Sequence, residues 1–236
     1  MATFVLVHGA WHGGWCWRDV VRFLREAGHD VFAPTLTGLG DRFHLAELGV
    51  VDLSTHITDV VNLLRFEELE KVRLVGHSYG GNVISGVAEV AEAQIDHLVY
   101  LDAIVPVHGK SHVEMVPARA GGAADQLKKA GKEAASLPVA GMGFLGVTRE
   151  SDVAWLRRRL VPHPMASLTE RSNLPADRAA ALPRTFIYCT QREGPPSAFA
   201  RAAREDPAWR YRELDTGHDA MVTAPRALTD LLLELA

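Results

Sequence analysis

The sequence predicts an α/β protein with a mostly parallel sheet of about six strands and helices on both faces. Short apolar runs alternate along the chain with longer segments in which apolar residues recur at helical spacing. The first of these runs, Phe4-Val5-Leu6-Val7, is continuously apolar, as expected of a parallel strand that is buried on both faces. Residues 107–183 interrupt this alternation, because they carry no strand signal.

The first part of the chain predicts four strands and the helices that connect them. Strands are expected at residues 4–7, 30–36, 72–75 and 97–101. Helices are expected at 17–27, where Gly28 supplies a stop signal, at 60–66, and directly after residue 80. Sequential strand, helix and strand units favour parallel neighbours in one sheet.

The last part of the chain returns to the same alternation. It predicts strands at 185–189 and 210–214 and a C-terminal amphipathic helix at 225–235. The intervening residues 107–183 are rich in Gly, Ala and Pro and contain charged helical pieces at 123–135 and 150–160. We therefore expect a core at 1–106 and 184–236, with 107–183 inserted as a helical cap over one edge of the sheet.

Composition narrows the classes of partner. The chain has 236 residues, of which 47% are hydrophobic and 23% charged, which suits one large domain or one domain with an insertion. A net charge of -4 and an isoelectric point near 6.3 give no basic footprint for nucleic acid or for an anionic membrane. The expected partner is a small molecule, and a homodimer is left open.

The spacing of the two cysteines indicates whether the chain binds a metal, and the first residues indicate where in the cell the protein is expected. Cys16 and Cys189 lie far apart without metal-ligand spacing, so we expect two buried thiols and no metal. A strand begins at Phe4 with no basic leader before it, and no apolar run is long enough to span a bilayer. These features predict a cytoplasmic protein without membrane contact.

The segment Gly76-His77-Ser78-Tyr79-Gly80 carries the strongest functional signal. It follows an apolar strand and precedes a helix, which is the setting of a nucleophile elbow. A serine at this strained corner exposes its hydroxyl, and the first N–H groups of the helix favour negative charge beside it. Ser78 is therefore the predicted nucleophile.

His218 is the predicted general base among eleven histidines. It lies between the last predicted strand and the last helix, a loop from which an imidazole can reach the elbow. His77 is expected to pack beside the serine, and His8 to shape the loop after the first strand.

Three motifs together resemble one family. They are the run from Phe4 to Trp17 (FVLVHGAWHGGWCW), the elbow at 76–81, and Tyr188-Cys189-Thr190. They are similar to the methylesterase and hydroxynitrile lyase branch of the α/β-hydrolase superfamily, which includes the plant salicylate methyl esterases. The similarity covers residues 2–106 and 184–236. It implies the α/β-hydrolase fold, the nucleophile and base named above, and no metal or organic cofactor. It also implies an oxyanion hole from the backbone N–H groups of Ala10 and Tyr79.

The chain departs from this family at the triad acid. The family aspartate follows the Cys-Thr pair by about two residues, where this chain has Arg192. The substitutes are Glu193, the neighbours of His218 (Asp215 and Asp219), and Asp102 after the strand at 97–101. We favour Asp102, because it ends a strand beside the elbow strand, where catalytic groups gather in parallel sheets. A residue adjacent to His218 is poorly placed to reach the far ring nitrogen, and Glu193 stays the alternative.

Two further positions separate esterases from lyases in this branch. The lyases carry threonine where this chain has Gly9 and lysine where it has Asp219. Their absence favours hydrolysis of small apolar or aromatic esters, with lactones and thioesters as neighbouring substrates. The pocket walls are expected to be apolar, drawn from Trp11, Trp15, Phe43, Met142, Phe144, Leu145 and Met165. The alternative is a catalytically weak or silent protein that binds a small hydrophobic ligand, which the missing family acid favours.

Overall fold

The fold is organised around one parallel sheet, as predicted. The computed structural model describes residues 1–47, 49–116, 135–191 and 193–236. Its six-stranded sheet has the order β2-β1-β3-β4-β7-β8, and every neighbouring pair is parallel. The strands are β1 Thr3–Val7, β2 Asp30–Phe32, β3 Val72–His77, β4 Ile95–Leu101, β7 Arg184–Cys189 and β8 Trp209–Leu214.

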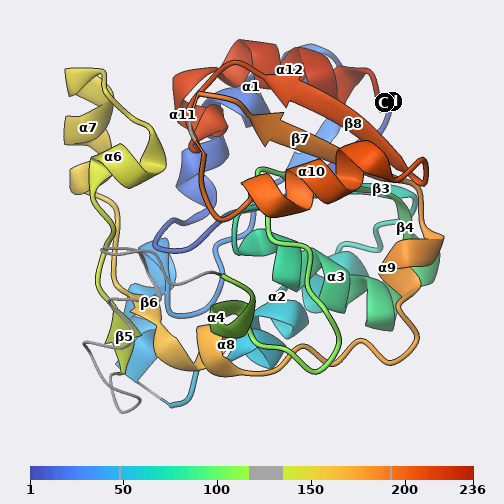
Figure 1. The fold of residues 1–236 in the computed structure, drawn as a ribbon, viewed down its shortest axis with the longest axis horizontal. Helices are drawn as coiled ribbons and strands as arrows, with labels where there is room; N and C mark the ends of the chain where they lie inside the picture. Colours follow the sequence, from blue (N-terminus) through green and yellow to red (C-terminus); the bar gives the residue numbers. More distant parts are fainter. Residues whose placement is uncertain (48, 117–134, 192) are drawn as a thin grey trace.

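Helices cover both faces of the sheet (Figure 1). One face carries α1 (Arg18–Glu26) and α12 (Pro225–Leu233), which pack against each other. The other carries α2 (Leu53–Phe66), α3 (Gly80–Ala91) and α10 (Ser197–Glu205). Shorter turns complete the core: η1 Gly14–Trp17, η2 Gly40–Glu47, η3 Glu92–Gln94 and α11 Ala220–Thr223.

Two predicted boundaries differ from the observed ones for local reasons. α2 begins at Leu53 rather than at residue 60, because the Asp52 side chain accepts a hydrogen bond from the Thr55 N–H (2.8 Å) and forms a capping box. β2 ends at Phe32 rather than at residue 36. Pro34 has no N–H for a strand ladder, and the Leu36 N–H donates to His8 Nε2 at 3.1 Å instead.

The segment 107–183 contains two strands that the sequence analysis did not expect. β5 (Ser136–Leu137) and β6 (His163–Pro164) form an antiparallel pair that is too short to produce a periodic signal. The predicted helix at 150–160 is present as α7 (Glu150–Arg157), whereas most of the one at 123–135 lies outside the described residues. The other helices of this segment are α4 His112–Met115, α6 Met142–Leu145, α8 Met165–Thr169 and α9 Arg178–Ala181.

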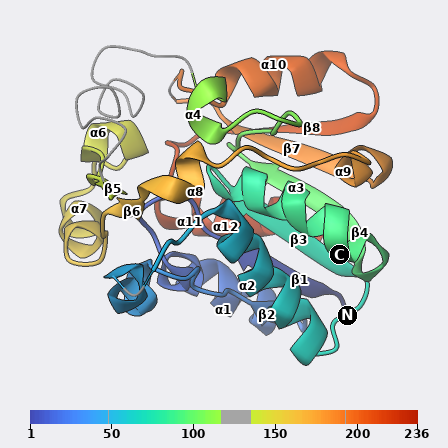
Figure 2. The same cartoon turned by 90° about the horizontal axis from the view of Figure 1, so that it is seen from below.

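The described pieces of 107–183 lie at different places around the core. In Figure 2, β5, β6, α6 and α7 lie together at one end of the molecule, whereas α9 lies near the opposite end. α8 packs against α2, and α9 packs against α3. A separate cap domain at 107–183 therefore stays a prediction.

The central strands supply a buried core. Phe4, Leu6, Leu74, Leu98 and Phe186 are fully inaccessible to solvent.

Cys16 and Cys189 are both buried and unpaired. Within the described ranges, no helix combines the length and apolar character needed to cross a bilayer.

Candidate active site

Ser78 occupies the sharp corner between β3 and α3. Its φ of +53° lies in the left-handed region, a strained conformation for a side chain other than glycine. The corner is tight enough that a Cβ on Gly76 would lie 2.6 Å from the Gly80 carbonyl oxygen. Hydrogen bonds from the Gly81 and Ile104 N–H groups to the Ser78 carbonyl, both 3.1 Å, hold this turn. The motif therefore forms the nucleophile-elbow geometry.

His218 links Ser78 to Asp102. The Ser78 hydroxyl lies 2.9 Å from His218 Nε2, and His218 Nδ1 lies 2.5 Å from Asp102 Oδ2. The exposed fractions of His218 and Asp102 are 8% and 5%. With the proton on Nδ1 donated to the carboxylate, Nε2 is free to accept from the serine.

The position of Asp102 follows from the strand order. It comes directly after β4, which lies between β3 and β7. Its backbone N–H donates to the Ile187 carbonyl at 2.7 Å, and its Oδ1 accepts from the Cys189 N–H at 3.3 Å. Both neighbours belong to β7, so two backbone contacts orient the carboxylate toward His218.

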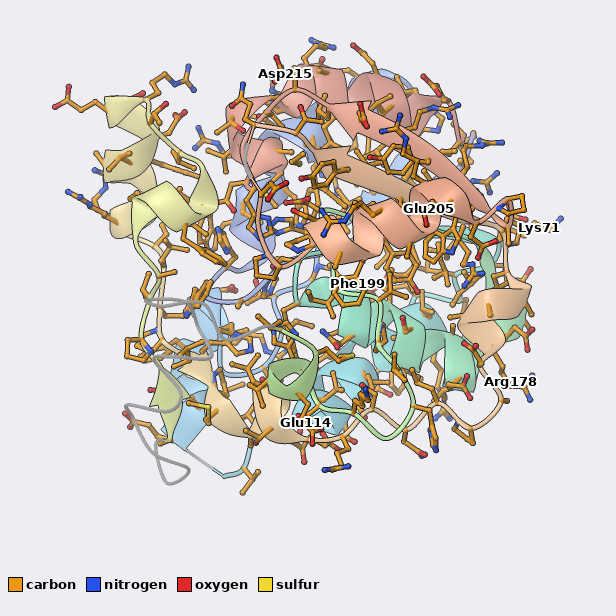
Figure 3. The ribbon with its side chains drawn as sticks, in the orientation of Figure 1. Lys71, Glu114, Arg178, Phe199, Glu205 and Asp215 are labelled. Atoms are coloured by element: carbon orange, nitrogen blue, oxygen red, sulfur yellow. The ribbon has the colours of Figure 1, made fainter. Side chains whose placement is uncertain are left out.

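The other candidate acids lie elsewhere. Glu193 is exposed, and the two ring nitrogens of His218 pair with Asp102 and Ser78 instead. Figure 3 shows Asp215 at the outer edge of the molecule, where its Oδ1 accepts from the Thr190 hydroxyl at 3.4 Å. Asp219 is fully buried but faces His12. Arg192, at the position of the family acid, lies outside the described residues.

The His12–Asp219 contact is a buried ion pair that the sequence analysis missed. His12 Nε2 donates to Asp219 Oδ2 at 3.1 Å, and its Nδ1 donates to the Ala10 carbonyl at 2.7 Å. Because both ring nitrogens donate, the ring is an imidazolium. Burial by itself lowers the pKa of His12, but the charge and hydrogen bond of Asp219 raise that pKa above its ordinary value. The partners are 207 positions apart, so no local pattern joins them.

His77 and His8 support the loops that meet at Ser78. His77 Nε2 donates to the His218 carbonyl at 3.0 Å, and burial holds the pKa of His77 well below its ordinary value. His8 Nδ1 donates to the Gly9 carbonyl at 2.9 Å, and burial lowers the pKa of His8 to about 3. Both rings are therefore neutral at neutral pH.

Ala10 and Tyr79 both line the cavity next to Ser78. Within the part of the chain that the structure describes, neither backbone N–H donates to another protein group. Gly9 is needed beside them, because a Cβ there would lie 2.9 Å from Ser78 Cβ and 2.8 Å from His77 Nδ1. The Tyr79 side chain points away from the reaction centre, since its hydroxyl donates to His56 Nδ1 at 2.9 Å.

A narrow cavity opens over Ser78; the empty space around it, counted together with the open solvent at its mouth, is about 550 Å³. Of the seven expected wall residues, only Trp11 and Phe144 line it. Phe43 and Met165 line a different hollow. Leu145 belongs to the hydrophobic core, and Trp15 and Met142 pack against it. The cavity residues that the sequence analysis missed are Ile104, His112, Val113, Val116, Leu137, Leu168, Pro195 and Pro196.

Comparisons with known proteins identify the family of this chain. The profile of the alpha/beta hydrolase family matches residues 4–231, which includes residues 107–183, outside the similarity found by motif. A carbendazim hydrolyzing esterase of Nocardioides sp. (strain SG-4G) is 41% identical over 244 positions, which cover all of both chains. The salicylic acid-binding protein 2 of Nicotiana tabacum is 31% identical, with 99% of this chain and 96% of that protein covered.

A solved structure shares the fold. It is an extracellular alpha/beta-hydrolase from a Paenibacillus species, with a TM-score of 0.85 at 24% identity over 99% of this chain and 98% of that one. The relatives include several methylesterases of Arabidopsis thaliana, so the branch inferred from the motifs is confirmed. The chain therefore belongs to the alpha/beta hydrolase family and is a hydrolase of the esterase type.

Proposed function

We propose that this chain hydrolyses small carboxylic esters through an acyl-enzyme on Ser78, with His218 as general base and Asp102 as the orienting acid. The observation that carries the proposal is the unbroken line of hydrogen bonds from Ser78 Oγ through both nitrogens of His218 to Asp102. The backbone N–H groups of Ala10 and Tyr79 complete the proposal as the oxyanion hole.

Acylation uses the two nitrogens of His218 in different roles. Ser78 Oγ attacks the ester carbonyl and transfers its proton to Nε2, which gives an oxyanion facing the two backbone N–H groups. Asp102 stabilises the imidazolium that forms. The alkoxide leaves with the proton from Nε2, and the acyl group stays on Ser78.

Deacylation repeats the sequence with water. Nε2 accepts a proton from the attacking water, a second oxyanion forms, and Ser78 leaves with that proton as the carboxylic acid is released. The neutral states of His77 and His8 matter here, because neither adds a positive charge that would compete with the imidazolium beside Ser78.

The cavity supports a small apolar or aromatic ester as substrate. Its walls are mostly aliphatic and aromatic, and Ser78 and His218 are among the residues that line it. Carbendazim should be tested as a substrate, because the 41% identical relative is named for its hydrolysis. Lyase chemistry is not favoured: Gly9 has no room for the threonine of the lyases, and Asp219, in place of their lysine, is paired with His12.

The silent-binder alternative depended on the missing family acid. Asp102 supplies a carboxylate at His218 Nδ1, so no observation now favours that alternative.

The test combines labelling with turnover. A fluorophosphonate probe should label the wild type once, and short-chain p-nitrophenyl esters should be hydrolysed. Ser78→Ala should lose both. Ser85→Ala is the matched control, because Ser85 lies on α3 with its hydroxyl bonded to the Gly81 carbonyl, away from the cavity. Labelling that survives in Ser78→Ala, or a wild type without label or turnover, would refute the proposal.

A further inference from the structure

His112 is a polar residue in the cavity wall that the proposed chemistry does not use. It opens the short helix α4 and lines the cavity together with Ser78 and Tyr79. Apart from Ser78 and His218, the other wall side chains in the described part of the chain are apolar or, like the Tyr79 hydroxyl, already hydrogen-bonded within the protein.

The hydrogen bonds of Asn82 determine the tautomer of His112. Asn82 Nδ2 donates to the Tyr79 carbonyl at 3.0 Å and lies 2.9 Å from His112 Nδ1. Exchanging the amide oxygen and nitrogen of Asn82 would place two acceptors, Oδ1 and the Tyr79 carbonyl, against each other. The amide nitrogen therefore faces both partners, and His112 Nδ1 must accept.

The proton of the neutral ring is therefore on Nε2. Burial lowers the pKa of His112 to about 4, so the ring carries one proton at neutral pH. Nε2 has no acceptor within the described residues and is not among the fully buried unpaired atoms. Since His112 lines the cavity, its ring offers there an N–H donor that has no acceptor among the described residues.

The segment that carries His112 is braced. The Gly109 N–H donates to the Ser172 carbonyl at 2.9 Å, and the Ser172 N–H donates to the Lys110 carbonyl at 3.0 Å. Arg171 pairs with Glu114 at 2.7 Å, and Figure 3 shows Glu114 on α4 at the surface. A donor held by such a frame is preorganised, because little freedom is lost when it binds an acceptor.

We infer that His112 Nε2–H is a specificity-determining donor that selects esters carrying a neutral hydrogen-bond acceptor, such as a ring nitrogen, in the part of the substrate that fills the cavity. The inference rests on the proposed esterase function for its substrates. A substrate without an acceptor desolvates this N–H and leaves it unpaired, which disfavours that substrate.

Methyl benzoate and the three methyl pyridinecarboxylates test the inference. They share one shape and differ in a ring nitrogen, and they are assayed at mildly alkaline pH, where the pyridines are neutral. The measured quantity is the ratio of kcat/KM for the pyridine isomer that the wild type prefers to kcat/KM for the benzoate. Intrinsic ester reactivity cancels when this ratio is compared between variants.

His112→Phe should lower the ratio at least about tenfold, because it keeps a flat ring and removes the donor. His112→Gln should restore much of it, because its amide can accept from Asn82 and donate to the cavity. Val113→Ala is the matched control: it changes the same wall without a polar group, so both esters should shift together. An equal ratio in the wild type and His112→Phe would overturn the inference.

Nuclear magnetic resonance of the 15N-histidine-labelled wild type gives a second measurement that needs neither turnover nor the Phe variant. The His112 signal, assigned by its loss in His112→Gln, should show the Nε2–H tautomer and should move on titration with pyridine but not with benzene. An Nδ1–H tautomer, or no response to pyridine, would refute the inference even if the esters are cleaved. Failure of all ester cleavage with a positive titration would refute the proposed function alone.

Discussion

Asp102→Asn tests the candidate site most severely, because it changes one atom and reverses the tautomer of His218. Oδ1 of Asp102 accepts from the Cys189 N–H, so the amide oxygen of the asparagine will keep this position. The amide NH2 then faces His218 Nδ1, which must accept. Nε2 consequently carries the proton and points it at Ser78, so the serine has no base.

The expected loss of kcat in Asp102→Asn follows from the hydrogen bonds that break when His218 returns to its active tautomer. To regain the active tautomer, the variant must place two N–H donors against each other where the wild type has a 2.5 Å bond. Losing a charge-assisted bond costs about 1.5–3 kcal/mol, and leaving a buried donor unpaired costs about 1–3 kcal/mol more. At about 1.4 kcal/mol per factor of ten, kcat should fall by about two to four orders of magnitude.

The assay is steady-state hydrolysis of a p-nitrophenyl ester, with thermal unfolding as a check that the variant folds. Glu193→Gln is the control, because this exposed carboxylate has no contact with His218 in the described structure, and it should retain wild-type kcat. If Asp102→Asn stays within tenfold of wild type, or if Glu193→Gln loses more, the assignment of the acid to β4 is wrong.

Three other perturbations follow from the same geometry. Gly9→Ala should lower kcat/KM by about a hundredfold and cost about 1–3 kcal/mol of stability, since its Cβ would displace Ser78 or the buried His77; a native rate would show that the loop adapts. The stability advantage of the wild type over His12→Gln/Asp219→Asn should be complete below pH 6.5, the ordinary His value, and should shrink as pH rises through the raised folded pKa of His12; urea titrations that find a pH-independent difference would contradict the ion pair. Burial lowers the pKa values of His8, His56, His77, His112 and His163; these residues gain protons mainly on unfolding, so the free energy of unfolding should fall as pH drops below 6.5, by up to about 1.4 kcal/mol per pH unit for each histidine. A flat profile between neutral pH and pH 5 would contradict this last expectation.

The sequence could predict what depends on local pattern. The alternation of short strand-like runs with helical segments predicted the six strands of the main sheet, and the elbow motif predicted Ser78 at the end of β3. Asp102 could be chosen over Glu193 without coordinates, because its strand was expected beside the elbow strand and catalytic groups gather at the carboxyl ends of parallel strands.

The features of the site that the sequence analysis missed depend on contacts between segments that are distant in the chain. His12 and Asp219 each look like ordinary loop residues, and only the fold brings them together. The cavity wall was mostly missed for the same reason, since hydrophobicity does not tell which apolar side chains face a hollow and which face the core. For His112, Asn82 at the start of α3 gave no sign that it would reach a residue thirty positions away.

Because the candidate acid follows β4, the residues proposed for catalysis and the loop that shapes the cavity belong to different parts of the fold. Ser78 and Asp102 follow adjacent strands, and the Ser78 N–H donates to the Leu101 carbonyl at 3.2 Å, so one rigid pair of strands sets their spacing. The loop after β7 does not carry the candidate acid, and it contributes Pro195 and Pro196 to the cavity wall. Changes of sequence in this loop can therefore reshape the substrate range while the spacing of nucleophile and acid stays constant. Variation among close relatives should concentrate there, and directed evolution of new ester specificities should begin with that loop.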